Sequence, residues 1–287
     1  MNERYYKVAE HVFVLKADEQ EELQQELRQY EPFLTEATDD ASFRMEIVDE
    51  LPETVYHEEM RQEDEGQTIV TGHTEEESSY FEFWLGKKLC SIMVVDKDYR
   101  EAKVCVKENW SFGVNNAIMV MYALATANSL TALFHSSVVS YQGKAYMFLG
   151  HSGTGKSTHS SLWLKYIEGT ELVNDDNPVV RIMDGVARVY GSPWSGKTPC
   201  YRNVVYPVGG IVKLDQAPYN EIKRLKGVKA YAVIVPSISG KRWDKKLAEG
   251  LHETENMLAQ LVPVWHLDCL PDEAAARLSC QNCAHGA

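Results

Sequence analysis

The sequence predicts an α/β fold, α+β over the whole chain, in which a smaller mixed α+β N-terminal domain precedes a larger core. Three observations predict it. An apolar, strand-like run at residues 145–149 leads directly into a glycine-rich loop and then a helical segment. A second strand-like run, residues 171–176, ends in two adjacent carboxylates. The 287-residue length accommodates one or two domains, and the composition turns apolar after Trp110.

The N-terminal domain is assigned residues 1–112 and the core residues 113–287, with the boundary falling within residues 105–130. Apolar and β-branched runs predict N-terminal strands at residues 8–15, 43–48, 68–71, 80–85 and 89–95. Good helix formers predict a helix over residues 18–29. Acidic stretches at residues 57–67 and 75–77 are typical of solvated loops.

In the core, residues 113–134 predict one or two buried helices. A Gln142-Gly143 turn predicts a hairpin between strands 136–140 and 145–149. Further strands are expected at residues 171–176, 178–182, 209–214 and 264–267, and helices at residues 158–166, 228–235, 245–261 and 271–279. Pro271 is expected at the first position of the last helix, where its missing N–H is tolerated.

The charge excludes one class of function. With 29 basic and 42 acidic residues the net charge is −13, so the basic surface that nucleic acids require is absent. No apolar run approaches the roughly 20 residues that cross a bilayer, and the N-terminus has no signal-peptide pattern. We therefore expect a cytoplasmic protein with no membrane partner.

Six cysteines are scattered through the chain, and in this compartment we expect reduced thiols. Cys280 and Cys283 form a CxxC at the C-terminus, which is half of a zinc site or a redox pair in other proteins. Because no second CxxC completes a tetrahedral site, we favour a frayed tail with two free thiols over a metal or redox role.

Residues 150–157, GHSGTGKS, match the phosphate-binding pattern G-x-x-x-x-G-K-[ST]. Glycines let backbone N–H groups turn toward an anion, the lysine neutralises the β- and γ-phosphates, and the serine hydroxyl ligates Mg²⁺. The helix that follows points its positive N-terminus at the phosphates. The pattern therefore predicts a P-loop that binds ATP and Mg²⁺ through Gly150, His151, Ser152, Gly153, Thr154, Gly155, Lys156, Ser157 and Thr158.

A second match to the same pattern occurs at residues 191–198. There the context fails, because Pro199 disfavours helical backbone angles at the preceding residue and Pro193 removes an N–H that a phosphate cradle would use. We read this segment as a loop at the border of the active site, with Ser195, Lys197 and Arg202 as candidate acceptor or phosphate contacts.

Asp175 and Asp176 follow the loop by about twenty residues, at the end of the next strand. Parallel strands present their C-terminal ends at the ligand crevice, so both carboxylates should face the phosphates. One carboxylate can hold Mg²⁺ and the other can take the proton of an attacking hydroxyl. His135 begins the strand pair that leads into the loop; in a hairpin it would lie beside Gly150, where it can contact a carboxylate or the transferred phosphoryl group.

The combination of His135, a hairpin, GHSGTGKS and then Asn-Asp-Asp resembles the core of HPr kinase/phosphorylase, and its order is similar to the nucleotide-binding core of phosphoenolpyruvate carboxykinases. The resemblance covers roughly residues 130–185. It implies that His135 and Lys156 are catalytic residues, that Asp175 is the catalytic base, and that Asp176 holds Mg²⁺ together with Ser157. The sequence departs from the family at Thr158, where an acidic residue is usual, and at residues 190–203, which replace a glycine-rich signature.

The resemblance implies an ATP- and Mg²⁺-dependent kinase that transfers the γ-phosphate to a Ser or Thr hydroxyl of a protein or peptide. HPr kinases assemble through this kind of core, so the resemblance is compatible with a homo-oligomer, although the sequence itself does not give the oligomeric state. Two alternatives remain: a kinase for a small hydroxylated metabolite, and a non-catalytic nucleotide-binding module whose acidic N-terminal region recruits a partner. The presence of Lys156, Ser157 and both aspartates favours turnover.

Overall fold

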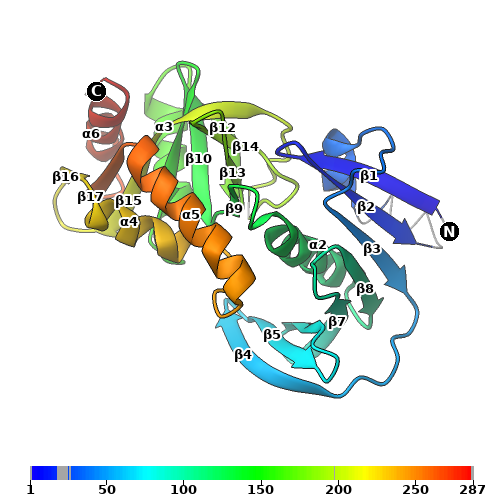
Figure 1. Cartoon of the computed structure of the whole chain (residues 1–287). Helices are drawn as coiled ribbons and strands as arrows, with labels where there is room; N and C mark the ends of the chain where they lie inside the picture. The colour runs from blue at the N-terminus through cyan, green and yellow to red at the C-terminus, as the bar shows by residue number, and fades with distance from the viewer. Residues whose placement is uncertain (1, 18–24, 26, 197, 286–287) are drawn as a thin grey trace. The chain divides into compact units, whose positions relative to one another are not determined.

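The computed structural model of the chain describes residues 2–17, 25, 27–196 and 198–285. The chain divides into two compact units, Met1–Thr126 and Ala127–Ala287, whereas the sequence-based boundary lay at residues 112/113. The difference is α2 (Trp110–Thr126), which packs on strands of the first unit. Both units are mixed α+β, each built on one sheet with few helices (Figure 1).

The first unit is a single mixed sheet in the order β1-β2-β3-β8-β7-β6-β5-β4. Its strands are β1 (Asn2–Val8), β2 (His11–Ala17), β3 (Phe43–Val48), β4 (Tyr56–Asp64), β5 (Gln67–Thr74), β6 (Ser79–Leu85), β7 (Lys88–Val95) and β8 (Glu101–Val106). A 3-10 helix, η1 (Arg28–Phe33), follows β2. β3 is parallel to both β2 and β8, and the remaining neighbours are antiparallel.

The core of the first unit is aromatic. Phe13 stacks on Phe43 with ring centroids 5.0 Å apart, and it meets Tyr30 and Tyr122 edge to face. The Tyr122 hydroxyl donates to the backbone oxygen of Val8, which ties α2 to the end of β1. Such aromatic contacts contribute about 0.5–1.5 kcal/mol each beyond the burial of apolar area.

Two N-terminal expectations are corrected. The strand expected at residues 8–15 begins only at His11, as β2, because Val8 ends β1 and Ala9 and Glu10 form the hairpin turn between the two strands with φ of 47° and 64°. The expected acidic loop at residues 57–67 is mostly β4, an edge strand with nearly every residue exposed. A strand exposed on both faces has no apolar alternation to reveal it. The helix expected over residues 18–29 falls largely outside the described residues, and its last two residues begin η1.

The second unit is also one sheet, in the order β12-β10-β11-β15-β14-β13-β9, with β17 paired to β15 and β16 to β17. Its strands are β9 (Thr131–Leu133), β10 (Ser136–Tyr141), β11 (Lys144–Leu149), β12 (Glu171–Asp176), β13 (Val179–Met183), β14 (Val186–Tyr190), β15 (Val205–Gln216), β16 (Glu221–Leu225) and β17 (Val264–Cys269). β11, β15 and β17 are parallel, while β10 is antiparallel to both of its neighbours.

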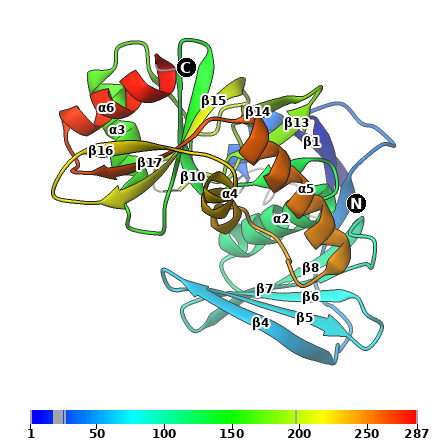
Figure 2. The ribbon, with the colours of Figure 1, turned by 60° about the vertical axis from the view of Figure 1, so that its left-hand side comes forward.

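The helices of the second unit are α3 (Lys156–Tyr166), α4 (Val228–Ile234), α5 (Lys245–Leu261) and α6 (Glu273–Ala284), with the 3-10 turn η2 (Val235–Ser237) after α4. α3 and α6 lie side by side and pack on one face of the sheet, with α4 on the other side of these strands (Figure 2). Trp163 of α3 is fully buried there, against residues of β11, β15 and β17.

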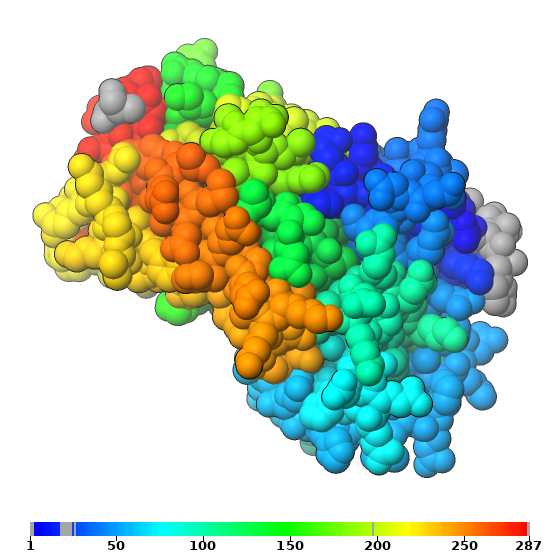
Figure 3. All heavy atoms as spheres, in the orientation of Figure 1, coloured from blue at the N-terminus to red at the C-terminus, as the bar shows by residue number. Residues whose placement is uncertain are grey.

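α5 is amphipathic and lies at the surface of the second unit (Figure 3). Its buried residues recur every three or four positions: Leu247, Gly250, Leu251, Thr254, Glu255 and Leu258. Asp244 caps its N-terminus by accepting from the backbone N–H groups of Lys246 and Leu247. The expected bounds of this helix, residues 245–261, match the structure. The capping residue Asp244 and the helical period of the buried residues indicate the same start.

Two C-terminal expectations are corrected. α6 begins at Glu273, and Asp272 rather than Pro271 defines the start, since the Asp272 side chain accepts from the N–H of Ala275. The expected frayed tail is wrong, because Cys280 and Cys283 are 5% and 4% exposed and belong to the core between α6 and the sheet. Burial raises the pKa of the Cys283 thiol, which disfavours the thiolate that metal binding or redox chemistry needs.

His159 of α3 makes the second unit sensitive to acid. The side chain is buried, its Nε2 lies 2.9 Å from Ser279 Oγ of α6, and burial lowers its pKa to about 4. Because the unfolded chain, with a pKa near 6.5, binds the proton first, stability is full above pH 7 and falls as the pH drops toward 4. At pH 5 the loss from this one group is about 2 kcal/mol. Urea unfolding at pH 7.5 and pH 5 should show His159→Gln losing less stability than the parent; an equal loss would contradict the buried neutral histidine.

Candidate functional site

The candidate site lies at the edge of the second sheet where β11 and β12 end. These two strands run in the same direction but are not neighbours, because β10 lies between them. Ser136, the first residue of β10, pairs with Leu149 on one side and with Asp176 on the other. The register therefore brings His135, the glycine-rich loop at residues 150–157 and the aspartate pair to one edge.

The loop at residues 150–157 has the backbone that its glycines predict. Gly153 and Gly155 have φ of 76° and 105°, a region that other residues rarely adopt. The N–H of Thr154 donates to the His151 oxygen, and α3 begins directly afterward at Lys156. Ser157 and Thr158 lie exposed in the first turn of α3, so the loop and the N-terminal end of the helix are open to solvent.

Lys156, His135 and Asp176 form a continuous chain of polar contacts. The Lys156 ammonium lies 2.9 Å from His135 Nε2 and donates to the backbone oxygens of Gly150 and His151 at 3.0 and 3.3 Å. The other ring nitrogen of His135, Nδ1, lies 3.2 Å from Asp176 Oδ1. Since an ammonium only donates, Nε2 accepts from Lys156 and Nδ1 carries the proton toward Asp176.

Asp175 differs from Asp176 in its surroundings. Asp175 is 5% exposed, and its Oδ1 is buried without a hydrogen-bond partner among the described residues. Its strand partner Ser137 contacts Ser160 of α3, so Asp175 shares the sheet face that α3 covers, whereas Asp176 shares the opposite face with Ser136. A buried carboxylate oxygen without a donor is unfavourable, which is expected where a cation or a substrate hydroxyl is to be bound.

The segment at residues 191–196 is held against the end of β12. Asn174 donates to Ser192 Oγ at 3.1 Å and to the Trp194 oxygen at 3.2 Å, while its own side-chain oxygen accepts from the N–H of Asp176. The N–H of Gly196 donates to the Asp175 backbone oxygen at 2.8 Å, and Ser195 bridges to Asp176. This backbone pairing places Ser195 beside Asp176, and the Ser195 hydroxyl donates to the Thr198 oxygen at 2.7 Å.

Of the other two candidates from this segment, Arg202 is not brought to the site. Lys197 lies outside the described residues. Arg202 lies at the opposite end of β12, where its guanidinium donates to the Leu172 oxygen at 2.6 Å and to the Glu171 carboxylate at 2.7 Å. Arg202 therefore holds the start of β12 in place instead of facing the loop at residues 150–157.

Several residues at this edge went unnoticed in the sequence. Asn174 and Ser192, both fully buried, hold the backbone at the end of β12 against residues 192–194; an asparagine directly before an Asp pair was the available signal. The backbone after α4 also reaches the site, since the N–H of His135 donates to the Ser237 oxygen at 2.7 Å. Gln216, at the end of β15, donates to the oxygens of Gly153 and Thr154. Nothing in the sequence links these last two segments to the loop.

The arrangement suits an anionic, metal-bound ligand. Exposed loop N–H groups, the Lys156 ammonium and the α3 N-terminus supply positive charge. The Ser157 hydroxyl and the two carboxylates supply the oxygen ligands that Mg²⁺ prefers. The buried oxygen of Asp175, which has no partner in the part of the chain that the structure describes, is the observation that fits these residues to a bound cation or hydroxyl.

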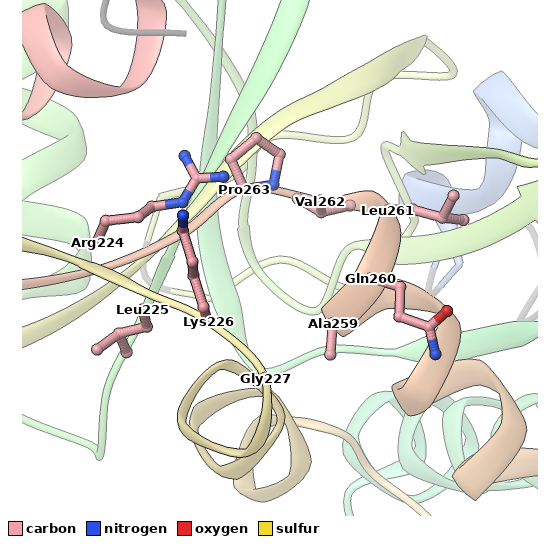
Figure 4. Close-up of a pocket in the computed structure, with 9 residues that line it drawn as sticks. All are labelled: Arg224, Leu225, Lys226, Gly227, Ala259, Gln260, Leu261, Val262 and Pro263. Atoms are coloured by element: carbon pink, nitrogen blue, oxygen red, sulfur yellow. The ribbon is translucent and has the colours of Figure 1, made fainter.

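Two cavities of the second unit lie at the other edge of its sheet. One, of about 230 Å³, is lined by residues 224–227 and 259–263, where β16 ends and β17 begins (Figure 4). The other, of about 650 Å³, is lined by Tyr141 at the end of β10, by residues 166–168 at and just after the end of α3, and by residues of α6. The candidate site is thus defined by converging polar groups and not by either cavity.

No family model and no curated protein matches the chain. Among solved structures, the chain is similar to one described as the Hpr(Ser) kinase/phosphatase from Coxiella burnetii. The match has a TM-score of 0.32 and 10% sequence identity, and it covers 54% of this chain and 95% of that chain. No helix in the described part of the chain is both long and apolar enough to cross a membrane.

Proposed function

We propose that the chain is an ATP- and Mg²⁺-dependent kinase that transfers the γ-phosphate to a Ser or Thr hydroxyl of a protein or peptide. The observation that carries the proposal is the meeting of a phosphate-loop sequence, the Lys156–His135–Asp176 chain and the buried Asp175 at one sheet edge. The resemblance of these same residues to HPr kinase/phosphorylase supports the choice of a hydroxyl acceptor.

The loop and its lysine bind the triphosphate. The N–H groups of residues 150–157 surround the phosphates, and Lys156 leaves the loop oxygens of Gly150 and His151 to neutralise the β- and γ-phosphates. Ser157 and Asp176 hold the cation. Bound Mg²⁺ supplies positive charge that offsets the charge developing on the transferred group.

Asp175 accepts the proton of the attacking hydroxyl. One oxygen of its carboxylate has no hydrogen-bond donor among the described residues, so that oxygen can receive the hydroxyl proton. The new oxygen–phosphorus bond forms as the bond between the γ-phosphorus and the β-phosphate oxygen breaks, and ADP is the leaving group. His135 is a positioning residue for Lys156: with Nδ1 held by Asp176, its Nε2 faces the ammonium at 2.9 Å. Ser195 pairs with Asp176 through the backbone, so we assign its segment to the approach of the acceptor.

The experiment that tests the proposal uses ATP labelled in the γ-phosphate with Mg²⁺. The parent protein should release or transfer the label, and Asp175→Asn should do so far more slowly. Label transfer to small hydroxylated compounds but not to Ser- or Thr-containing peptides would support a metabolite kinase instead. If both proteins bound Mg-ATP tightly but released the label no faster than in the absence of protein, the chain would be a non-catalytic binding module.

Lys156 and Lys197, the lysines that follow a glycine in the two loop-like segments, should differ in how much they contribute to Mg-ATP affinity. Lys197→Ala should leave Mg-ATP affinity nearly unchanged, because Pro199 prevents the helix start that a phosphate loop needs. A reduced rate of transfer with normal affinity would fit a position beside the acceptor. Calorimetric titration checks this, and a loss of affinity equal to that of Lys156→Ala would reverse the ranking of the two loops.

A further inference from the structure

A cluster of charged side chains lies on β15 and β17, next to β11, the strand that leads into the glycine-rich loop. The proposed function gives this cluster no role. It consists of Lys213 and Asp215 on β15 and His266 and Asp268 on β17. Lys213 pairs in register with His266, and Asp215 with Asp268. Since Lys213 also pairs with Leu149, the last residue before the loop, the cluster begins level with the start of that loop.

The cluster and the aspartate pair occupy opposite flanks of the loop. A row of registered residues crosses the sheet from Asp176 through Ser136 and Leu149 to Lys213 and His266, all on one face. Asp176 and Lys213 are three strand spacings apart, about 14 Å. In the proposed function the γ-phosphate of the bound nucleotide lies near Asp175 and Asp176. The sugar, at the other end of the triphosphate, then lies on the opposite side of the loop, next to β15 and β17.

Asp215 is held in place as an anion with room for a further partner. Its Oδ1 lies 2.7 Å from the Lys213 ammonium and its Oδ2 lies 2.7 Å from His266 Nε2, yet the side chain is 47% exposed. Burial tends to raise the pKa of this carboxyl, but the hydrogen bonds from Lys213 and His266 outweigh it, and the net pKa is lowered. An exposed carboxylate with both oxygens oriented is a suitable acceptor for hydroxyl groups.

Residues 216–220, which follow Asp215, are hydrogen-bonded both to the glycine-rich loop and to residues 269–272. Gln216 donates to the loop oxygens of Gly153 and Thr154 at 3.2 and 3.4 Å. The N–H of Ala217 donates to the Cys269 oxygen, and Asn220 contacts both Asp272 and the N–H of Leu270. Asp215 is therefore kept at a fixed position relative to the phosphate-binding backbone.

We propose that Asp215 accepts hydrogen bonds from the ribose hydroxyls of the nucleoside triphosphate whose phosphates are bound by residues 150–157. The inference rests on the proposed function and adds the sugar side of the same site. Carboxylates at strand ends bind ribose hydroxyls in other nucleotide-binding folds. The carboxylate makes the site prefer a ribonucleotide to one without sugar hydroxyls.

A cation is the competing occupant, because ligand atoms of Asp215, His266 and Asp268 lie within 4.8 Å of one another. The Lys213 ammonium argues against it. That ammonium is 2.7 Å from Asp215 and already balances its charge, so a divalent cation bound at this place would be repelled. A neutral ligand that donates hydroxyl hydrogens has no such conflict.

The test compares three probes by calorimetric titration in Mg²⁺: ATP, 2′,3′-dideoxy-ATP and inorganic tripolyphosphate. The variant is Asp215→Asn. The matched control is Glu221→Gln on β16, which removes a carboxylate that is likewise paired with a lysine, Lys223 at 2.8 Å, but two strands further from the loop. Thermal unfolding of each variant shows that it is folded.

We expect the parent to bind ATP about ten- to a hundredfold more tightly than dideoxy-ATP, the range for hydrogen bonds to a charged group. Asp215→Asn should remove this preference and leave tripolyphosphate affinity unchanged, while Glu221→Gln behaves as the parent. Equal weakening of ATP and dideoxy-ATP, or no weakening, would overturn the role of Asp215 with the proposed function intact. A parent protein that binds none of the three probes would overturn both.

Discussion

Asp175→Asn is expected to lower phosphoryl transfer about 10²–10⁴-fold while Mg-ATP binds about as tightly as to the parent protein. The range is that of general-base catalysis by a positioned side chain. Asparagine keeps the shape of the residue but cannot accept the hydroxyl proton. Its environment should tolerate the change, because the buried Oδ1 has no hydrogen-bond partner among the described residues that would be lost. Transfer rates with saturating ATP and separate titrations of the nucleotide measure the two effects.

Asp176→Asn is the matched comparison for that experiment, since it makes the same change at the neighbouring residue on the opposite face of the sheet. Its defect should appear mainly as a raised Mg²⁺ requirement. It should also loosen His135, whose Nδ1 lies 3.2 Å from the Asp176 carboxylate. The reverse outcome, with Asp175→Asn raising the Mg²⁺ requirement and Asp176→Asn slowing transfer at saturating Mg²⁺, would exchange the two roles.

Lys156→Ala is expected to lower transfer about 10²–10³-fold, the loss seen when one electrostatic donor to a developing negative charge is removed. Nucleotide affinity should fall as well, since the ammonium contacts the β- and γ-phosphates in the proposed complex. The change should also free His135, whose Nε2 loses the donor that now lies 2.9 Å away. Transfer assays and nucleotide titration on the same preparation give both effects.

Lys165→Ala is the control for this change, because Lys165 lies in the last turn of the same helix, α3, and its side chain extends over the Tyr166 ring. Removing the same charge at the far end of the helix should leave transfer within a factor of about two, as expected for a surface substitution. If Lys165→Ala lost as much activity as Lys156→Ala, the effect would belong to the overall charge and not to the loop.

The elements that the sequence predicted best are those in which a periodic pattern and an end signal agree. α5 has apolar residues on one face and Asp244 as a cap, and β12 is a buried strand that ends in charged residues. The elements that the sequence analysis predicted wrongly share one physical cause: their sequences have neither a periodic apolar pattern nor an end signal. β4 is exposed on both faces, and the turn at Ala9 and Glu10 contains neither Gly nor Asn.

The candidate site was predictable to the extent that its parts are close in sequence. His135, the loop and the aspartate pair lie within about forty residues, and the hairpin of β10 and β11 brings the histidine to the loop. Arg202 was placed with them because it follows Ser195, yet the backbone turns away and the side chain binds Glu171 at the far end of β12. Gln216 and Ser237 come from distant segments, and only the strand order and the loop after α4 bring them to the site.

The most direct test of the account is a titration of the parent protein and of Lys156→Ala with ATP, with and without Mg²⁺. The account predicts one saturable Mg-ATP site on the parent, with affinity at least about tenfold weaker in Lys156→Ala, as expected for the loss of a charge-assisted contact. Omission of Mg²⁺ should weaken binding to the parent as well. A folded parent protein that does not bind Mg-ATP at millimolar concentration, or a Lys156→Ala variant that binds it equally well, would contradict the assignment of residues 150–157 as the phosphate-binding loop.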